Sequence, residues 1–572
     1  MINQEVVNDL VFHGYNSYLE EFDGLECVMV DICVDENNLT LFHLLPKEIT
    51  KLPVFYVMPA DILVNLSHLF YSPKNDIYSV CVTTQDSISL NFNCPLLVIR
   101  ASLERHISLI TRAIQDPVWN KQELLREFSA NWSQVCDLNA REFICASENG
   151  GIEAIEVLGP QSRTKYGFSS HFMGISASSQ ALPDFSLLNR YIRYSKRAVA
   201  GRGLILPMET LHPAPKSTEG IEAWYLEALA NISTKTKEQF TKKYALYRCT
   251  EYWIIFNACT PSGKTWFGIY FKTNKKRCLP TTKEHLKKWK LKAIRAKVFN
   301  KESVMPRSGA NVSLNEKNVL LVGCGSVGGE IAQKLGSSGI GRIVLSDPDI
   351  FSIDNLYRHV LNGSDIGFSK TMALGNDLDL RFPWLLTSCF ESSLLELRDK
   401  NLLKHIDLII ISIGSPTHER IFWEFIQTIP EPPAVINSWL EGLEIGGHAT
   451  IDIPSSPGCL NCAYIDTKDY SRGLASNLNF IESNQDVTIN YAGCGELFLP
   501  YSGLSASKTA IIAADLAIKY LSGKLNKSSK ISWKGDMDEA ASKGIQLTHR
   551  YYHFDKSLQI LPLRHEACDV CY

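Results

Sequence analysis

The sequence from residue 318 to residue 349, NVLLVGCGSVGGEIAQKLGSSGIGRIVLSDPD, decides the fold of the second half of the chain. It begins with an apolar run, turns in G-x-G-x-x-G spacing at Gly323, Gly325 and Gly328, and continues with a helical pattern and a second apolar run. This order predicts a strand, a tight turn, a helix and a parallel strand. Glycines let backbone N–H groups approach a phosphate closely, and a helix N-terminus adds partial positive charge. We therefore expect an α/β, Rossmann-like unit that binds a nucleotide.

The polar residues after the second apolar run distinguish between kinds of nucleotide site. Asp347 stands about 20 residues beyond the glycine turn, where an acidic side chain can hold ribose hydroxyls. A second acid, an amide and two fixed cations follow: Asp349, Asn355, Arg358 and Lys370. Cations near the phosphate end of the turn suit polyphosphate chemistry better than hydride transfer. An ordinary Rossmann unit with a solvated arginine and lysine is the alternative.

The order G-x-G-x-x-G, D-x-D, N-L-x-R and G-x-x-K resembles the ThiF/MoeB-type adenylyltransferases and ubiquitin-activating enzymes. This resemblance implies an adenylation domain that uses ATP and Mg²⁺. The sequence departs from the family at Ser415, after the apolar strand predicted at residues 408–411, because many relatives have an aspartate there that helps to hold Mg²⁺ and the phosphates. Metal binding then falls to Asp347, to Asp349 or to the triphosphate itself.

The composition is that of a multidomain protein. A chain of 572 residues with 45% hydrophobic side chains is long enough for several cores. A net charge of −3 gives no general signature for nucleic-acid binding. There is no basic and apolar leader and no run of about 18 apolar residues, so we expect a cytoplasmic protein without a membrane span. Its 16 cysteines are therefore expected to be thiols rather than disulfides.

Residues 1–116 are predicted to form a small α+β domain, with an N-terminal helix, short strands and a closing helix near residues 102–114. Cys81 lies in an apolar-flanked segment that enters a polar turn before that helix. This order resembles a ubiquitin-conjugating-type domain, whose transfer cysteine follows the sheet, although the His-Pro-Asn tripeptide of that family is absent. The alternatives are that Cys81 is a buried strand cysteine, or that Cys94 is the nucleophile.

Residues 117–309 show no catalytic spacing and are predicted to be a mixed α/β linker domain. We expect a docking helix, two strands and a basic helix, at residues 117–136, 252–257, 265–272 and 283–297 respectively. The loop signal at residues 306–309 marks the start of the adenylation domain, residues 310–572.

Two C-x-x-C pairs lie in the adenylation domain, and four thiolates are enough for a closed tetrahedral zinc site. The cysteines are Cys459, Cys462, Cys568 and Cys571. The wide separation of the pairs requires the fold to bring them together, and ThiF-type enzymes often carry such a split pair. A redox dithiol would need a thioredoxin-like context, which is missing.

Cys494 lies between the two pairs, flanked by Gly493 and Gly495 and followed by a helix predicted at residues 506–521. Flanking glycines leave a cysteine accessible, and a nearby helix N-terminus can lower the pKa of its thiol. Cys494 is therefore the candidate thioester cysteine, and a plain turn is the alternative. Cys324, inside the glycine turn, is expected to pack rather than react.

The whole chain resembles bacterial fusions of a ubiquitin-conjugating-like domain, a linker and a ubiquitin-activating-like domain, as found in CBASS antiphage operons. The resemblance implies adenylation of a protein C-terminal carboxylate, on a cGAS-like nucleotidyltransferase or a ubiquitin-like protein, by a homodimer. Arg358 and Lys370 would neutralise phosphate charge and Asn355 would position the reactants. The acyl group would pass to Cys494, then to Cys81 and finally to a target amine.

Three other functions are compatible with parts of the sequence. A sulfur-carrier adenylyltransferase of cofactor biosynthesis would use the same nucleotide domain but leaves the N-terminal half unexplained. An NAD-dependent oxidoreductase would not need the two cations. A nucleotide-binding scaffold with a degenerate site would explain Ser415.

Overall fold

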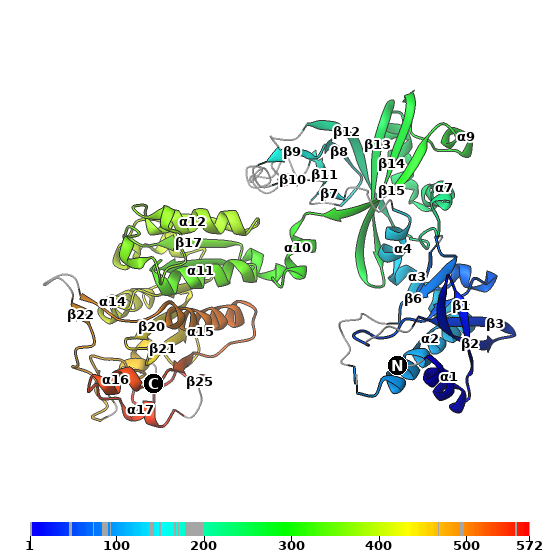
Figure 1. The fold of residues 1–572 in the computed structure, drawn as a ribbon. Helices are drawn as coiled ribbons and strands as arrows, with labels where there is room; N and C mark the ends of the chain where they lie inside the picture. The colour runs from blue at the N-terminus through cyan, green and yellow to red at the C-terminus, as the bar shows by residue number, and fades with distance from the viewer. Residues whose placement is uncertain are drawn as a thin grey trace. The chain divides into compact units, whose positions relative to one another are not determined.

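The computed structural model describes residues 3–44, 49–72, 74–82, 90–91, 93–136, 142–147, 150–164, 167–169, 171–177, 198–466, 468–490, 497–554 and 558–570. Within these residues the chain forms two compact units, the first reaching Asn300 and the second beginning at Lys301 (Figure 1). None of the described helices combines the length and the apolar character needed to cross a bilayer.

The N-terminal lobe, the described part of residues 3–116, is an antiparallel sheet packed against helices. Its strand order is β1-β2-β3-β4-β6-β5. The elements are α1 (Asn3–Phe12), β1 (Asn16–Phe22), β2 (Leu25–Val34), β3 (Asn37–His43), β4 (Tyr56–Val57), β5 (Leu69–Ser72), β6 (Ile77–Val80) and α2 (Pro95–Gln115). Val98, Ile99, Leu103 and Ile110 form the buried side of α2 in the lobe's core.

The rest of the first unit is a closed barrel with the strand order β11-β7-β15-β14-β13-β12-β8. The strands are β7 (Phe143–Ala146), β8 (Glu153–Leu158), β11 (Phe172–Ser176), β12 (Val199–Met208), β13 (Cys249–Thr260), β14 (Gly263–Arg277) and β15 (Lys290–Val298). Helices α4 (Phe128–Gln134) and α7 (Ile221–Asn231) pack on the barrel; α3 (Pro117–Arg126) precedes α4, and α8 (Thr234–Gln239) follows α7. Phe128 and Trp132 of α4 are fully buried against Trp224 and Phe267, so α4 is part of the barrel's core.

The basic helix predicted at residues 283–297 is wrong over most of its length. Helix α9 covers only Lys283–Leu286, and the following lysine-rich segment is strand β15. Lys290 and Lys292 are exposed while Ala293 is buried, so the segment has the two-residue alternation of a strand. It is held between β14, which runs antiparallel to it, and β7, which runs parallel.

The second unit is an eight-stranded sheet with helices on both faces, which confirms the Rossmann-like fold predicted for it. The strand order is β18-β17-β16-β19-β20-β21-β24-β25, with β18 to β20 parallel and the others antiparallel. The strands are β16 (Asn318–Val322), β17 (Arg342–Ser346), β18 (Leu386–Phe390), β19 (Leu408–Ile411), β20 (Ala434–Glu441), β21 (Gly446–Asp452), β24 (Ser529–Lys534) and β25 (Leu558–Pro562).

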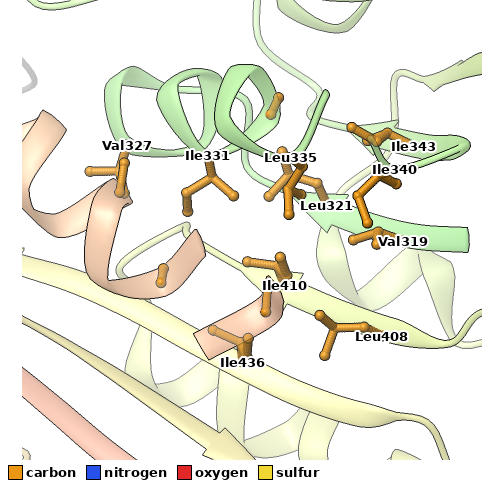
Figure 2. Packing of buried hydrophobic residues seen from close by; sticks show 14 of the residues in the cluster. Val319, Leu321, Val327, Ile331, Leu335, Ile340, Ile343, Leu408, Ile410 and Ile436 are labelled. Carbon is orange, nitrogen blue, oxygen red and sulfur yellow. The ribbon is translucent and has the colours of Figure 1, made fainter. Parts of the chain in front are cut away.

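Helices α11 (Ser326–Ser338), α12 (Lys370–Arg381) and α15 (Gly503–Leu521) cover one face of this sheet, and α14 (Pro416–Ile426) covers the other. Shorter helices are α10 (Lys301–Arg307), α13 (Lys400–Leu403), α16 (Asp538–Ser542) and α17 (His549–Tyr552). Figure 2 shows Ile331 and Leu335 of α11 packed over Leu321 of β16 and Ile410 of β19. Because both faces are covered, β19 is apolar along its whole length and β16 is apolar from Val319 to Val322.

The strand order places the site. The chain leaves β16 toward β17 on one side, and β19 lies on the other side, so the order reverses between β16 and β19. In open α/β sheets, ligands bind outside the carboxyl ends of the strands at such a reversal. The ends of β16 and β19 are followed by Gly323 and Ser412.

Candidate functional site

Two of the three glycines of the turn after β16, Gly323 and Gly328, are required by steric crowding. Gly323 has a φ of +88°, and a Cβ there would lie 2.8 Å from the carbonyl oxygen of Ser412. A Cβ on Gly328 would collide with the carbonyl oxygen of Gly323. Gly325 precedes α11 and faces open space, because no heavy atom of the described chain lies within 4 Å of a Cβ built there. The turn is thus tight at two glycines and open to a ligand at the third.

Asp347 ties the glycine turn to the tip of β17. Its carboxylate accepts the N–H of Cys324 at 2.6 Å and the N–H of Asp349 at 2.8 Å, and the residue is only 6% exposed. The side chain that was expected to hold ribose therefore orders the turn through backbone hydrogen bonds, and its role toward ribose stays a prediction. Cys324 is fully buried, and burial raises the pKa of its thiol, as expected for a packing residue.

Lys370 and Asp349 form an ion pair beside the turn. Nζ of Lys370 lies 2.7 Å from Oδ2 of Asp349, and the Lys370 N–H donates to the Asp349 carbonyl at 3.1 Å. The lysine side chain is 10% exposed and the aspartate side chain 64%. The Lys370 side chain is therefore nearly buried and fixed by Asp349, while the Asp349 carboxylate remains open to solvent or to a ligand.

A cavity of about 550 Å³, called the turn cavity below, lies at this edge of the sheet. Six of the residues selected from the sequence line it: Gly323, Gly325, Asp347, Asp349, Lys370 and Ser415. Several further polar residues, not selected from the sequence, also line the cavity: Ser326, Ser392, Ser393, Ser412, His418 and Tyr501. Ser392 and Ser412 follow β18 and β19 closely, so the rule that ligands bind at the carboxyl ends of parallel strands is the signal that identifies them.

Asn355, Arg358 and Gly328 are not among the residues that line the turn cavity. Oδ1 of Asn355 accepts from the backbone N–H and the hydroxyl of Ser352, at 3.3 and 3.1 Å. The guanidinium of Arg358 lies 4.8 Å from the centre of the Tyr501 ring. Tyr501 lines the cavity, so Arg358 contacts the site through that ring.

A second cavity of about 590 Å³, the side cavity, adjoins the first. The two cavities share Val327, Ser412, Ile413 and Tyr501. The remaining walls of the side cavity come from the start of α14, the end of β20, Tyr464, the segment 474–487 and Leu499. A molecule that filled both cavities would therefore pass the glycine turn.

Glu419 stands in the first turn of α14, where it lines the side cavity. Oε1 accepts the N–H of Ser415 at 3.0 Å, and Oε2 accepts from the side-chain amide of Asn437 at 3.2 Å. Burial raises the pKa of this carboxyl to about 7. The hydroxyl of Ser415 hydrogen-bonds Nδ1 of His418 at 2.9 Å.

Glu441 fixes the outer wall of the side cavity. Its carboxylate accepts the N–H groups of Phe480 at 2.6 Å and Ile481 at 2.8 Å. Nε2 of the fully buried His448 lies 2.8 Å from the same carboxylate, and burial lowers the pKa of that imidazole. These three contacts use most of the acceptor capacity of Glu441 and connect β20 to the segment at Phe480 and Ile481.

Three of the four predicted zinc ligands converge. The sulfurs of Cys459, Cys462 and Cys568 lie within 4.8 Å of one another, with Cys459 3.9 Å from Cys462 and 3.5 Å from Cys568. A tetrahedral ion with Zn–S bonds of about 2.3 Å separates its sulfurs by about 3.8 Å. All three residues are buried, so the donors fit a structural zinc ion. Cys571 lies outside the described residues.

Of the two proposed acyl-carrying thiols, only Cys81 lies within the described residues. Cys81 directly follows β6 and is exposed, and its N–H donates to the carbonyl of His68 at 2.9 Å. Cys94, the alternative, is also exposed and precedes α2. Cys494 lies outside the described residues.

A half-buried charge cluster, not anticipated from the sequence, joins the N-terminal lobe to the barrel. Nδ1 of His68 lies 2.6 Å from Glu127, Nε2 lies 3.3 Å from Glu123, and the His68 N–H donates to Glu127 at 2.8 Å. Burial alone would lower the pKa of His68, but the two carboxylates outweigh it and raise the pKa. Lys216 donates to the carbonyl of Leu66 at 3.2 Å, and burial lowers its pKa to about 8.

The glycine turn, the strand order and the convergent thiols define a class of domain, and comparison with known families gives its name. Residues 302–570, a little under half of the chain, match the ThiF family. The second unit is therefore a ThiF-type domain. The predicted resemblance to bacterial ThiF-type proteins related to ubiquitin transfer is confirmed by the relatives described next.

The ATP-dependent ubiquitin transferase-like protein Cap2 of Escherichia coli (strain TW11681) is 27% identical over 229 residues, which is 39% of this chain and 38% of that protein. Cap2 of Vibrio cholerae serotype O1 is 24% identical over 36% of each chain. The adenylyltransferase and sulfurtransferase MOCS3 of Xenopus laevis is 37% identical over 14% of this chain and 18% of its own. This chain thus spans well under half the length of these relatives.

Among solved structures, E. coli MccB with ATP aligns with 46% of this chain and 68% of its own chain. The sequence identity is 20% and the TM-score is 0.32.

Proposed function

We propose that the second unit uses ATP and Mg²⁺ to adenylate the C-terminal carboxylate of a protein. The observation that carries this proposal is the pair of joined cavities. The turn cavity offers glycine N–H groups and Lys370 to a triphosphate, and the side cavity has room for the end of a polypeptide. Their shared residues would bring the carboxylate to the nucleotide beside Ser412.

In the first step a carboxylate oxygen forms a bond to the α-phosphorus of ATP, the bond between that phosphorus and the bridging oxygen to the β-phosphorus breaks, and pyrophosphate leaves. The protein has to orient the reactants and neutralise the charge on the phosphates. The turn's N–H groups and Lys370 serve the second task. The exposed carboxylate of Asp349 would hold Mg²⁺, which supplies further charge neutralisation when bound.

We further propose that the acyl group then moves between thiols. The thiolate of Cys494 attacks the acyl carbon and AMP leaves, the thiolate of Cys81 displaces Cys494, and a target amine finally displaces Cys81 to form an amide. The similarity to Cap2 proteins, whose name describes ubiquitin transferase-like activity, supports this relay. The exposure of Cys81 leaves it accessible to a partner thiol.

The partners and the setting follow from the same resemblance. We propose a cGAS-like nucleotidyltransferase or a ubiquitin-like protein as carboxylate donor, a role in antiphage defence in the cytoplasm, and a homodimer built through the second unit. Exposed apolar side chains on that unit support a subunit interface: Tyr357, Phe368, Met372, Leu504 and Ile511. Zinc on the cysteine cluster would be structural.

The test is ATP–pyrophosphate exchange with and without a protein that offers a free C-terminus. Exchange that depends on that protein supports the proposal. Binding of ATP without exchange, for every candidate donor, would instead indicate a degenerate nucleotide-binding scaffold.

A sulfur-carrier adenylyltransferase is the second candidate, because the similarity to MOCS3 reaches 37% over a short region. It would also catalyse exchange. It would not form a thioester on Cys81, so a non-reducing gel after incubation with ATP and the carboxylate donor distinguishes the two.

A further inference from the structure

We propose that the side cavity selects protein C-termini that are neutral or basic next to their terminal carboxylate, and that Glu482 sets this preference. The inference rests on the proposed function of the second unit and names a property of its substrate.

The ionisable side chains with a carboxyl or basic group that line the side cavity are all acids. Three acids line it, Glu419, Glu441 and Glu482, and its described lining residues include no lysine, arginine or histidine. Three arginines lie behind these walls without lining the cavity, one of them Arg358 on the ring of Tyr501. Arg420 donates to the carbonyl of Gly473 and stacks on Tyr464, while Arg550 donates to Ser532 and stacks on Phe480. An acidic tail would therefore meet like charge at the cavity surface, where the described lining offers no cation to pair with it.

Only one of the three acids is available to a ligand as a free charge. Glu419 and Glu441 accept hydrogen bonds from groups of the protein. The carboxylate of Glu482 has no hydrogen-bond or ion-pair partner among the described residues. Its backbone N–H donates to the carbonyl of Gln546 at 3.0 Å. Glu482 is half-buried in the cavity wall, where screening by solvent is incomplete.

The cavity also carries an unused polar group. Ser438 is 1% exposed and lines the cavity, and its hydroxyl has no hydrogen-bond partner among the described residues. A buried hydroxyl without a partner is costly, so a peptide group of a bound tail would satisfy it. Trp439 and Leu440 beside it supply apolar contact. The wall therefore suits an extended, uncharged or basic peptide whose backbone is recognised by hydrogen bonds.

The experiment uses the full chain and short synthetic peptides that share one C-terminal residue and carry serine, lysine or glutamate at the positions before it. ATP–pyrophosphate exchange gives KM and kcat for each peptide. We expect the KM of the glutamate peptides to exceed that of the lysine peptides about tenfold, the effect of one unfavourable charge contact near a solvated surface. The two KM values should approach each other at high salt. Glu482→Gln should remove the difference and Glu482→Lys should reverse it.

Glu431→Lys is the matched control, because Glu431 is exposed on the same unit and lines neither cavity. It should keep the wild-type preference. Equal KM values for acidic and basic peptides in the wild type, or an unchanged preference in Glu482→Lys, would overturn the inference while leaving adenylation intact. The absence of exchange with every peptide and with an intact protein donor would overturn the proposed function itself.

Discussion

Replacing Lys370 by alanine separates a catalytic role from a structural one, because the two roles predict very different magnitudes. The ammonium is 2.7 Å from Asp349, whose side chain is 64% exposed and can rehydrate when the lysine is removed. An ion pair with one solvated partner contributes about 0–1 kcal/mol to stability. Loss of one preorganised group that stabilises developing charge costs about 10²–10³-fold in kcat, or about 2.7–4 kcal/mol. We therefore expect exchange to fall at least a hundredfold with a small change in Tm.

The assay is ATP–pyrophosphate exchange with saturating protein donor, paired with thermal unfolding. Lys543→Ala is the control, because Lys543 forms an ion pair of the same length with Glu539 and lines neither cavity. Arg358→Ala should reduce exchange less than Lys370→Ala, since Arg358 contacts the turn cavity only through Tyr501. Near-normal exchange in Lys370→Ala, or a loss of exchange matched by loss of folded protein, would refute the proposed role of the lysine.

Three further predictions follow from the thiols and from a buried histidine. The purified chain should hold about one zinc ion and Cys568→Ser should lose it; full zinc in that variant by metal analysis would contradict the site. Cys494→Ala should retain pyrophosphate exchange but form no thioester. Cys81→Ala should accumulate a thiol-sensitive adduct, visible on a denaturing gel, and stop before conjugation. Normal conjugation by either variant would exclude that cysteine from the relay. Burial lowers the pKa of His106 to about 4. Below pH 6.5 the unfolded state binds the proton more readily than the folded state, so acid favours unfolding. The free energy of unfolding of the N-terminal lobe should therefore fall by about 3 kcal/mol between pH 6.5 and 4. Urea titrations across that range should show this loss, and a flat profile, or the same slope in His106→Gln, would contradict it.

The central part of the second unit could be predicted because its signals are local. The turn at Gly323, the helix after it and the apolar strand β19 each depend on a few consecutive residues. The position of Lys370 beside the turn could also be anticipated. Lys370 begins α12, the helix that follows β17, so it lies near the end of that strand.

The barrel and the side cavity depend on contacts between distant residues, so the sequence alone did not predict them. Strand β15 has a lysine-rich composition that suggests a helix, and only its pairing with β14 and β7 makes it a strand. Glu419, Glu441 and Glu482 come from three separate segments and meet only in the folded domain. The partner of Asp347, a backbone N–H of the glycine turn, likewise follows from strand pairing rather than from spacing.

The charge cluster around His68 bears on how the first unit can be divided. A fragment that ends at residue 116 would keep His68 but lose Glu123 and Glu127, which lie beyond the cut and surround its imidazole. The fragment would also lose the hydrogen bonds that Asn120 and Glu127 accept from the backbone N–H groups of Ser67 and His68, just before the edge strand β5. The same helical segment sends Phe128 and Trp132 into the barrel, so the barrel would lose two core residues if the segment were kept with the lobe. The lobe and the barrel therefore share the segment from α3 to α4, and the first unit has to be expressed and studied as one piece.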